Sequence, residues 1–191
     1  MILETIVSTL DASSRPNFAP MGISLEEDRV LLRPFRGTQT WKNLDEVGAG
    51  VVHFTDDVLL FARCALSAPL PPHRPAETVR GVILLDTCHW KEFSIESRDL
   101  SGERGRFLGR VVAAGRARDF AGLNRAKHAV IEATILATRL HLLGRARVLE
   151  EMARLRPLLD KTGGAEEREA FAFIGDYVRD WAAPAEVSDA R

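Results

Sequence analysis

The spacing of apolar residues divides the chain into two parts with different expected structures. Up to about Phe120, apolar residues occur in short runs that often alternate with polar ones, which is typical of β-strands joined by turns. Beyond that point they recur at helical spacing, which is typical of amphipathic helices. We therefore predict a β-barrel domain over residues 1–120, a helical subdomain over residues 121–182 and a frayed tail over residues 183–191.

The first part is expected to be mainly β-structure with two small helices. One short helix is predicted at Thr40–Val47, and another, capped by Asp56 or Asp57, runs to Ala65. The proline-containing stretch Leu70–Pro75 is expected to be irregular. Many short strands with two helical insertions indicate a closed or nearly closed barrel. The strands are predicted at Ile2–Leu10, Asn17–Leu25, Val30–Phe35, Val51–Phe54, Val82–Leu85, Trp90–Ser97 and Phe107–Arg116.

The second part is expected to form three helices. Asn124 caps the first, which runs to Leu143 and ends at Gly144. The second covers roughly Arg145–Leu155, and Pro157 ends or kinks it. The third runs from about Glu166 to Trp181, with an apolar stripe along one side, formed by Phe171, Ile174, Val178 and Trp181.

The first of these helices carries an unusual charged stripe, which consists of Arg125, His128, Glu132 and Arg139. It lies between two apolar faces, one of Ala126, Val130, Ala133, Ala137 and Leu140, the other of Ile131, Ile135 and Leu142. The opposite side, with Lys127, Thr134, Thr138 and His141, is expected to face solvent. The stripe is either an ion-pair ladder centred on Glu132 or part of a partly buried site, and the flanking apolar residues favour burial.

Composition and charge exclude several classes of protein as expectations for this chain. The chain has 191 residues and a formal net charge of −1, so no global basic field would attract nucleic acid or an anionic membrane. No apolar run is long enough to span a bilayer, and the N-terminus does not resemble a signal peptide. Cys64 and Cys88 are far apart and are expected to be reduced, buried thiols. We therefore expect a cytoplasmic protein without a bound metal.

The segment RPFRGTQTWKN (Arg33–Asn43) is the strongest candidate for a ligand site. Arg33 and Arg36 bracket a strand end, Gly37 permits a tight turn, and the hydroxyls of Thr38 and Thr40 precede a helix start. A helix N-terminus offers free N–H groups and positive potential, so phosphate is the natural guest. The alternative is ordinary capping by Thr40, with the arginines simply on the surface.

Two further segments could contact a ligand. In NFAPMG (Asn17–Gly22), Pro20 implies a sheet edge or a bulge, and Gly22 would allow a flat ligand close to the backbone. In HFTDD (His53–Asp57), the adjacent carboxylates suggest acid–base or Mg²⁺ chemistry, but capping of the next helix explains them more simply. The other histidines show no nucleophile–histidine constellation that spacing could support.

Taken in order, these segments resemble a known family. NFAPMG, RPFRGTQTWKNL, GVVHFTDD and NRAKHAVIEATILATRL are similar to the domain of unknown function 447 family. That family looks like a branch of the flavin-reductase-like FMN-binding split barrels with an added helical C-terminal part. The resemblance covers about Ile2–Leu143, and the ordered combination is more specific than any single segment.

The resemblance implies a six-stranded split barrel that forms a homodimer and binds FMN near each subunit junction. By motif, Arg36, Gly37, Thr38, Thr40 and Asn43 would hold the phosphate and ribityl end. The isoalloxazine would lie along Asn17, Pro20, Met21 and Gly22, with Thr55 and Asp56 nearby. His53 departs from the pattern, since many such flavoproteins have Asn at this place, and this weakens its assignment as a ligand.

The leading functional hypothesis is an FMN-dependent oxidoreductase or flavin reductase of unknown substrate that accepts electrons from a nicotinamide donor. The flavin carries the hydride chemistry, so no acid–base residue is required and none is assigned. The alternative is a non-catalytic flavin-binding or interaction module that uses the charged stripe for assembly. A third hypothesis is a different phosphorylated or tetrapyrrole ligand. Under the flavin hypotheses, the stripe would line either a dimer seam or the flavin pocket.

Overall fold

The computed structural model describes residues 1–66 and 69–182, which fall into two compact units. One unit contains residues 1–57 and 69–122, and the other contains residues 58–66 and 123–182 of the described part. The second unit therefore includes α2 (Val58–Ala65), a helix from the first half of the chain. Neither unit is one continuous segment of the sequence.

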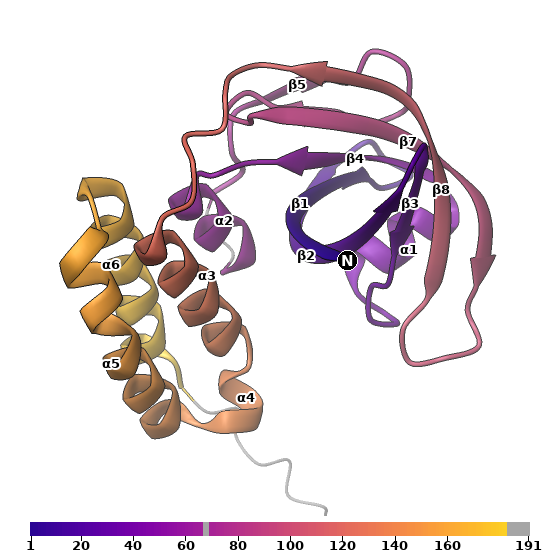
Figure 1. The fold of residues 1–191 in the computed structure, drawn as a ribbon. Helices are drawn as coiled ribbons and strands as arrows, with labels where there is room; N and C mark the ends of the chain where they lie inside the picture. The colour runs from indigo at the N-terminus through magenta and orange to yellow at the C-terminus, as the bar shows by residue number, and fades with distance from the viewer. Residues whose placement is uncertain (67–68, 183–191) are drawn as a thin grey trace, which may run out of the picture. The chain divides into compact units, whose positions relative to one another are not determined.

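The first unit is built on a closed antiparallel barrel of six strands (Figure 1). In the order of their hydrogen bonding, the strands are β1 (Ile2–Leu10), β2 (Pro16–Glu26), β3 (Arg29–Leu32), β8 (Arg106–Arg116), β7 (His89–Asp99) and β4 (Ala49–Phe54). Strand β4 pairs back with β1 and closes the ring. This confirms the predicted barrel. Its core consists of Val7, Ile23, Val30, Leu32, Leu44, Val52, Phe93 and Phe107.

A small second sheet belongs to the same unit. It pairs β5 (His73–Pro75) with β6 (Val82–Leu84), so the prediction that Leu70–Pro75 is irregular was wrong for its last residues. A strand this short carries no readable periodicity. The hairpin is held by tertiary packing of Ile83 against Val51 and Trp90, which the local sequence does not reveal.

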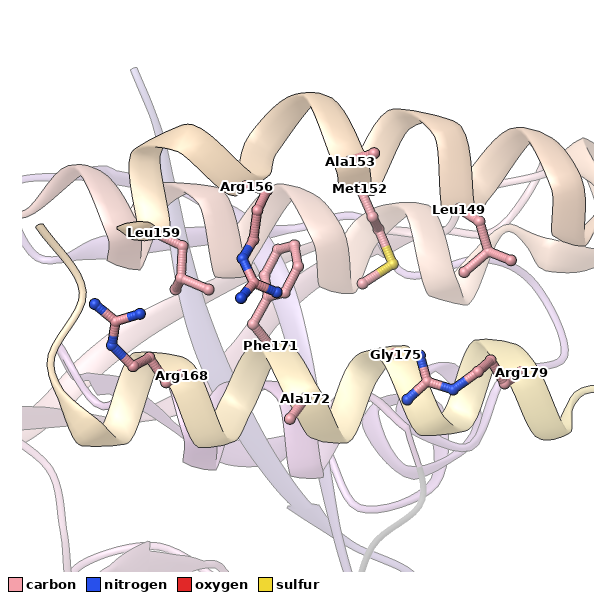
Figure 2. A pocket seen from close by; sticks show the side chains of 10 residues that line it. All are labelled: Leu149, Met152, Ala153, Arg156, Leu159, Arg168, Phe171, Ala172, Gly175 and Arg179. Atoms are coloured by element: carbon pink, nitrogen blue, oxygen red, sulfur yellow. The ribbon is translucent and has the colours of Figure 1, made fainter. Parts of the chain in front are cut away.

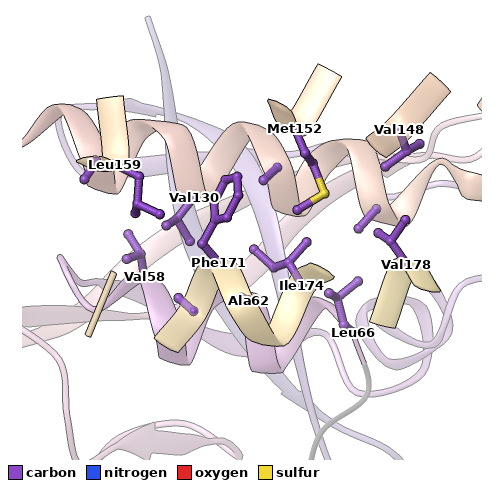
Figure 3. Close-up of a cluster of buried hydrophobic side chains, with 14 of the residues drawn as sticks. Val58, Ala62, Leu66, Val130, Val148, Met152, Leu159, Phe171, Ile174 and Val178 are labelled. Atoms are coloured by element: carbon purple, nitrogen blue, oxygen red, sulfur yellow. The ribbon is translucent and has the colours of Figure 1, made fainter. Parts of the chain in front are cut away.

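The helical unit contains α2 and four later helices around one apolar core. These are α3 (Arg125–Thr138), α4 (Leu140–Leu143), α5 (Arg145–Thr162) and α6 (Ala165–Asp180). Figure 3 shows side chains from α2, α3, α5 and α6 meeting in this core. Residues Phe171, Ile174 and Val178 of the predicted α6 stripe are buried in it, and Trp181 packs against it.

Two predicted helix boundaries were wrong. The first helix is interrupted at Arg139, whose ψ of 16° is not helical; the Thr138 hydroxyl donates to the Ile135 carbonyl there and offers the backbone a local alternative. The second helix continues through Pro157 to Thr162. Its last turn is held from α3, because the Asn124 side chain donates to the Thr162 carbonyl at 3.0 Å. This tertiary bond helps to hold the helical turn that follows the proline.

The faces of α3 agree only partly with the prediction. Its main apolar face is buried as expected. Thr134, placed on the solvent face, is also buried and donates to the Val130 carbonyl at 2.8 Å. All four residues of the charged stripe are exposed in the single chain. Within the described residues the stripe contains no ion pair, so the alternative of a Glu132 ladder was wrong. The burial that its apolar flanks favoured is not seen within one chain either.

Among residues 1–66 and 69–182, no helix combines the length and apolar character that crossing a membrane requires.

Candidate functional site

The turn before α1 (Gln39–Glu46) has the geometry of an anion site. Gly37 has φ of +82°, a conformation that glycine adopts without strain. Thr38 is the N-cap of α1: its hydroxyl accepts from the Trp41 N–H at 3.4 Å and donates to the Phe35 carbonyl at 2.7 Å. The alternative of capping by Thr40 was therefore wrong. The turn presents the positive end of a helix dipole at the surface.

Arg36 lies on the surface in this turn. Its backbone N–H donates to the Glu103 carbonyl at 2.8 Å, which fixes the start of the turn. Its guanidinium makes no ion pair with any described residue, and the same holds for the exposed Arg33. Both charges are therefore available to an anion, and Arg36 lies in the turn that leads into α1.

Polar side chains beneath α1 join two of the predicted segments. The Asn17 amide donates to the Thr40 hydroxyl at 3.0 Å. The buried Asn43 amide donates to the Thr9 hydroxyl at 2.9 Å, and Thr9 pairs with Asn17 across the β1–β2 ladder. Gln39 completes the group, because its side-chain amide donates to the side-chain Oδ1 of Asn43 at 2.7 Å. These bonds hold α1 against the hairpin, and they involve two residues, Thr9 and Gln39, that the sequence alone did not indicate.

The Pro20–Met21–Gly22 stretch lies at an open edge of the sheet. These residues pair with β1, whereas pairing with β3 begins only at Ser24. The edge predicted from Pro20 is thus confirmed. At Gly22 an added Cβ would lie 2.7 Å from the side chain of Ile2, so the absence of a side chain there makes room for a neighbouring strand residue as well as for a ligand.

The strand register also brings the HFTDD segment near this stretch. Ile6 of β1 pairs with Pro20 on one side and with His53 on the other. Both neighbouring strands run antiparallel to β1. Thr55 and Gly22, each two residues further along, therefore both lie toward the start of β1. The barrel thus places the two segments on neighbouring parts of one wall.

The Asp56 carboxylate is already bonded on both oxygens. One oxygen lies 2.6 Å from the Arg118 guanidinium, and the other accepts from the Ala121 N–H at 2.7 Å. The residue is buried, and these bonds anchor the chain that follows β8. Thr55 accepts from the Asp57 N–H at 3.0 Å. A direct role of Thr55 or Asp56 at a ligand remains a prediction.

The two cysteines differ in exposure. Cys88 is buried beside the Asp56 carboxylate, with 3.6 Å between the sulfur and the nearer oxygen. Burial raises the pKa of the Cys88 thiol, so it stays protonated and unreactive at neutral pH. Cys64 is only partly buried, so the expectation of two buried thiols was wrong for this residue.

A separate hollow of about 540 Å³ lies in the helical unit between α5 and α6 (Figure 2). Leu149, Met152, Leu159 and Phe171 form its apolar part. Arg156, Arg168 and Arg179 also line it, and each lies within 4.0 Å of an aspartate carboxylate. None of the predicted site residues lines this hollow.

Comparison with solved structures places the fold among FMN-binding proteins. The FMN-bound protein MM1853 from Methanosarcina mazei is 28% identical, with 92% of this chain and 94% of that chain covered and a TM-score of 0.80. An FMN-binding protein from Thermus thermophilus with bound p-hydroxybenzaldehyde is 20% identical over 63% and 73% of the two chains, with a TM-score of 0.53. The styrene monooxygenase flavin reductase from Pseudomonas putida is 17% identical over 61% and 80%, with a TM-score of 0.50.

The distant matches show a shared flavin-reductase-like fold and nothing more. The comparison with curated proteins finds no match. Two family models, however, cover most of the chain. The model of the N-terminal domain of DUF447, a family of proteins of unknown function, matches residues 3–118. A second DUF447 model matches residues 124–176. The chain therefore belongs to the DUF447 family.

Proposed function

We propose that the protein binds FMN, with the flavin phosphate at the N-terminus of α1. The observation that carries this proposal is the turn itself, where an unpaired guanidinium, a positive-φ glycine and a threonine N-cap precede the helix. Charge-assisted bonds from Arg36 and backbone N–H groups suit a phosphate dianion. The FMN-bound DUF447 protein, 28% identical over nearly the whole chain, supports the choice of FMN among phosphorylated ligands.

The remaining predicted residues have distinct parts in this proposal. Arg36, Gly37 and Thr38 bind the phosphate. Thr40 and Asn43 are buried, so they act mainly by holding α1 against the β1–β2 hairpin. Asn17 and the edge stretch Pro20–Gly22 lie along the flavin ring. Thr55 and Asp56 lie near the flavin ring, and Asp56 also anchors the chain after β8 through bonds on both of its oxygens.

The proposed activity is that of an FMN-dependent oxidoreductase or flavin reductase that uses a nicotinamide donor. Bound FMN would supply hydride chemistry, while this chain binds and orients it. The second candidate is a non-catalytic flavin-binding module, in which the exposed, unpaired stripe on α3 would serve assembly alone. Anaerobic addition of NADH or NADPH to the FMN-loaded protein distinguishes the reductase from the binding module. Bleaching within seconds supports the reductase, and an unchanged flavin spectrum supports the module.

The phosphate site can be tested by replacing Arg36 with alanine. The variant should bind FMN about 10- to 150-fold more weakly, because a charge-assisted hydrogen bond contributes about 1.5–3 kcal/mol. Quenching of flavin fluorescence on titration with flavin-free protein measures the affinity. The control is Arg154→Ala, which removes an exposed, ion-paired arginine from α5 and should leave FMN affinity unchanged. An Arg36→Ala variant with wild-type affinity would place the phosphate elsewhere.

We further propose that the protein is a homodimer, with the charged stripe of α3 in the subunit interface. A stripe that is exposed and unpaired in one chain, beside the partly buried Ile131 and Ile135, suits pairing with a second copy. Sedimentation velocity should give twice the chain mass of 21.2 kDa. Glu132→Arg should shift the equilibrium toward monomer by leaving like charges opposed. A monomeric wild-type protein at micromolar concentration contradicts the proposal.

A further inference from the structure

Pairing between the β3 and β8 segments continues beyond the regular ladder. The last ladder pair joins Leu32 and Phe107. An isolated bridge then joins Phe35 and Arg104, each three residues beyond the last ladder pair on its own segment. The Gly105 N–H donates to the Pro34 carbonyl at 3.0 Å between these two pairs. The steps are equal on both sides, so Arg33 lies opposite Arg106.

One face of this extension is strongly basic. Residues opposite one another in an antiparallel pair point to the same face, as do residues two apart along a strand. Arg33, Phe35, Arg104 and Arg106, here called the arginine ladder, therefore share a face, and all four are exposed. The other face carries Pro34 and Gly105, which are buried. The ladder leads directly into the proposed phosphate turn at Arg36.

The charges of the arginine ladder are unpaired, and this sets the ladder apart within the barrel unit. Neither its three arginines nor Arg36 has a carboxylate within ion-pairing distance in the described part of the chain. Asp99 pairs with Arg106 in the strand register and forms no ion pair with it; its carboxylate accepts from the N–H and hydroxyl of Ser101. These bonds lower the pKa of Asp99, and the more distant Arg106 charge lowers it further. Every other arginine of the unit bonds to a carboxylate or a carbonyl, namely Arg15, Arg29, Arg74, Arg80, Arg98, Arg110, Arg116 and Arg118.

Such an arrangement is unfavourable without an anion. Like charges directly opposite each other across two strands destabilise a sheet. The chain as a whole has a net charge of −1, so three unpaired guanidiniums on one face are a local feature and not a consequence of composition. Arg36 follows directly along the chain but lies one step out of this alternation, so a flavin phosphate held there leaves the charge of the ladder uncompensated. Three positive charges on one face suit a diphosphate group.

Phe35 adds a stacking surface to the same face. Its side chain is 53% exposed, and the Arg104 guanidinium lies 3.9 Å from its ring centroid. A planar guanidinium and an aromatic ring together offer a face on which a nucleobase can stack. Phosphates and a base in one ligand are the chemistry of a nucleotide.

We propose that the arginine ladder binds the adenosine diphosphate moiety of a dinucleotide. Arg33 and Arg106 contact its phosphates, and the adenine stacks against Arg104 and Phe35. The inference rests on the proposed FMN function, since a flavin phosphate at Arg36 leaves the ladder free. A nicotinamide dinucleotide donor would bring its adenosine diphosphate to the ladder as a second ligand. In FAD the phosphate nearer the flavin would stay at Arg36, and the adenosine monophosphate part would extend along the ladder; binding studies can distinguish these two sources.

The direct test uses ADP as the probe and the FMN-loaded protein as the receptor. Calorimetric titration should show saturable ADP binding, with adenosine at least 10-fold weaker. The double variant R104A/R106A should lower ADP affinity at least 10-fold and leave FMN affinity within about twofold. Arg154→Ala, the charge-matched control, should leave both unchanged. All three positions are exposed, and a thermal melt verifies folding. Absent ADP binding, or equal ADP affinity in the double variant, overturns the proposal.

Two further measurements identify the source of the moiety. If it belongs to the donor, the double variant should raise the KM for NADH or NADPH at least 10-fold with little change in kcat. If it belongs to the flavin, wild-type protein should bind FAD more tightly than FMN, and the double variant should abolish that difference. Should the protein bind no FMN, the proposed function fails, whereas ADP titration of the flavin-free protein still reports on the ladder independently.

Discussion

Replacing Glu92 with alanine is expected to lower the free energy of unfolding by about 3–5 kcal/mol. The side chain is fully buried on β7, and its carboxylate accepts three backbone N–H groups from the loop between β5 and β6. The donors are Glu77 at 3.0 Å, Thr78 at 2.7 Å and Val79 at 3.0 Å. Alanine removes the only carboxylate that these donors contact among the described residues. The loop would have to move to let water replace it.

The loss should spread beyond this loop. Arg80, in the same loop, donates to the carbonyls of Asp11 and Ala12 at 3.1 and 2.6 Å, so the loop also holds the β1–β2 turn. Urea unfolding measures the total effect, and hydrogen exchange should show faster exchange of the Glu77–Val79 amides. The matched control is Glu96→Ala on the same strand, whose exposed ion pairs contribute about 1 kcal/mol or less. A similar loss in both variants, with exchange at Glu77–Val79 unchanged, argues against the role of Glu92.

Glu92 also shows why part of the fold could not be predicted from the sequence. The strand around it is evident from its alternation, and the barrel follows from many such strands. An acidic residue on the same side as Trp90 conflicts with that pattern, but the sequence cannot tell which backbone groups compensate it. The partners lie 13–15 residues earlier in an irregular loop. Long-range bonds from side chain to backbone leave no periodic signal.

The candidate site, like the fold, could be predicted from the sequence only in part. The segments around Asn17 and Asn43 were expected to meet, and the structure joins them through Thr40 and Thr9. The alternative of a cap at Thr40 lay two residues too late, because both threonines fit a cap by sequence and only the backbone conformation of Thr38 selects it. Arg104 and Arg106 carry no local motif. They reach the phosphate turn only through strand pairing, which the sequence does not specify.

His53 is expected to make the protein less stable as the pH falls below neutral. Its imidazole is fully buried, with Nδ1 3.0 Å from the Ile6 carbonyl and Nε2 accepting from the Leu84 N–H at 3.1 Å. The N–H donor at Leu84 requires an unprotonated Nε2, so Nδ1 carries the proton and the ring is neutral. Burial lowers the pKa of His53 to about 4 from an ordinary value of 6.5, although the backbone hydrogen bond to Ile6 opposes this shift.

The sign of the pH effect follows from these two pKa values. Above pH 6.5 neither the folded nor the unfolded state binds the proton, so this residue leaves stability unchanged there. Between pH 6.5 and about 4 the unfolded chain takes up the proton and the folded chain does not, which lowers the free energy of unfolding by about 3 kcal/mol in total. Urea unfolding from pH 7.5 to 4 should show this loss in wild-type protein.

His53→Gln keeps a donor and an acceptor without titrating, so its stability should fall about 3 kcal/mol less over the same range. His89→Gln serves as the control, because burial and the nearby Lys91 and Arg116 also lower the pKa of that partly buried histidine, with a smaller expected effect. Parallel curves for wild type and His53→Gln would show that another group is responsible.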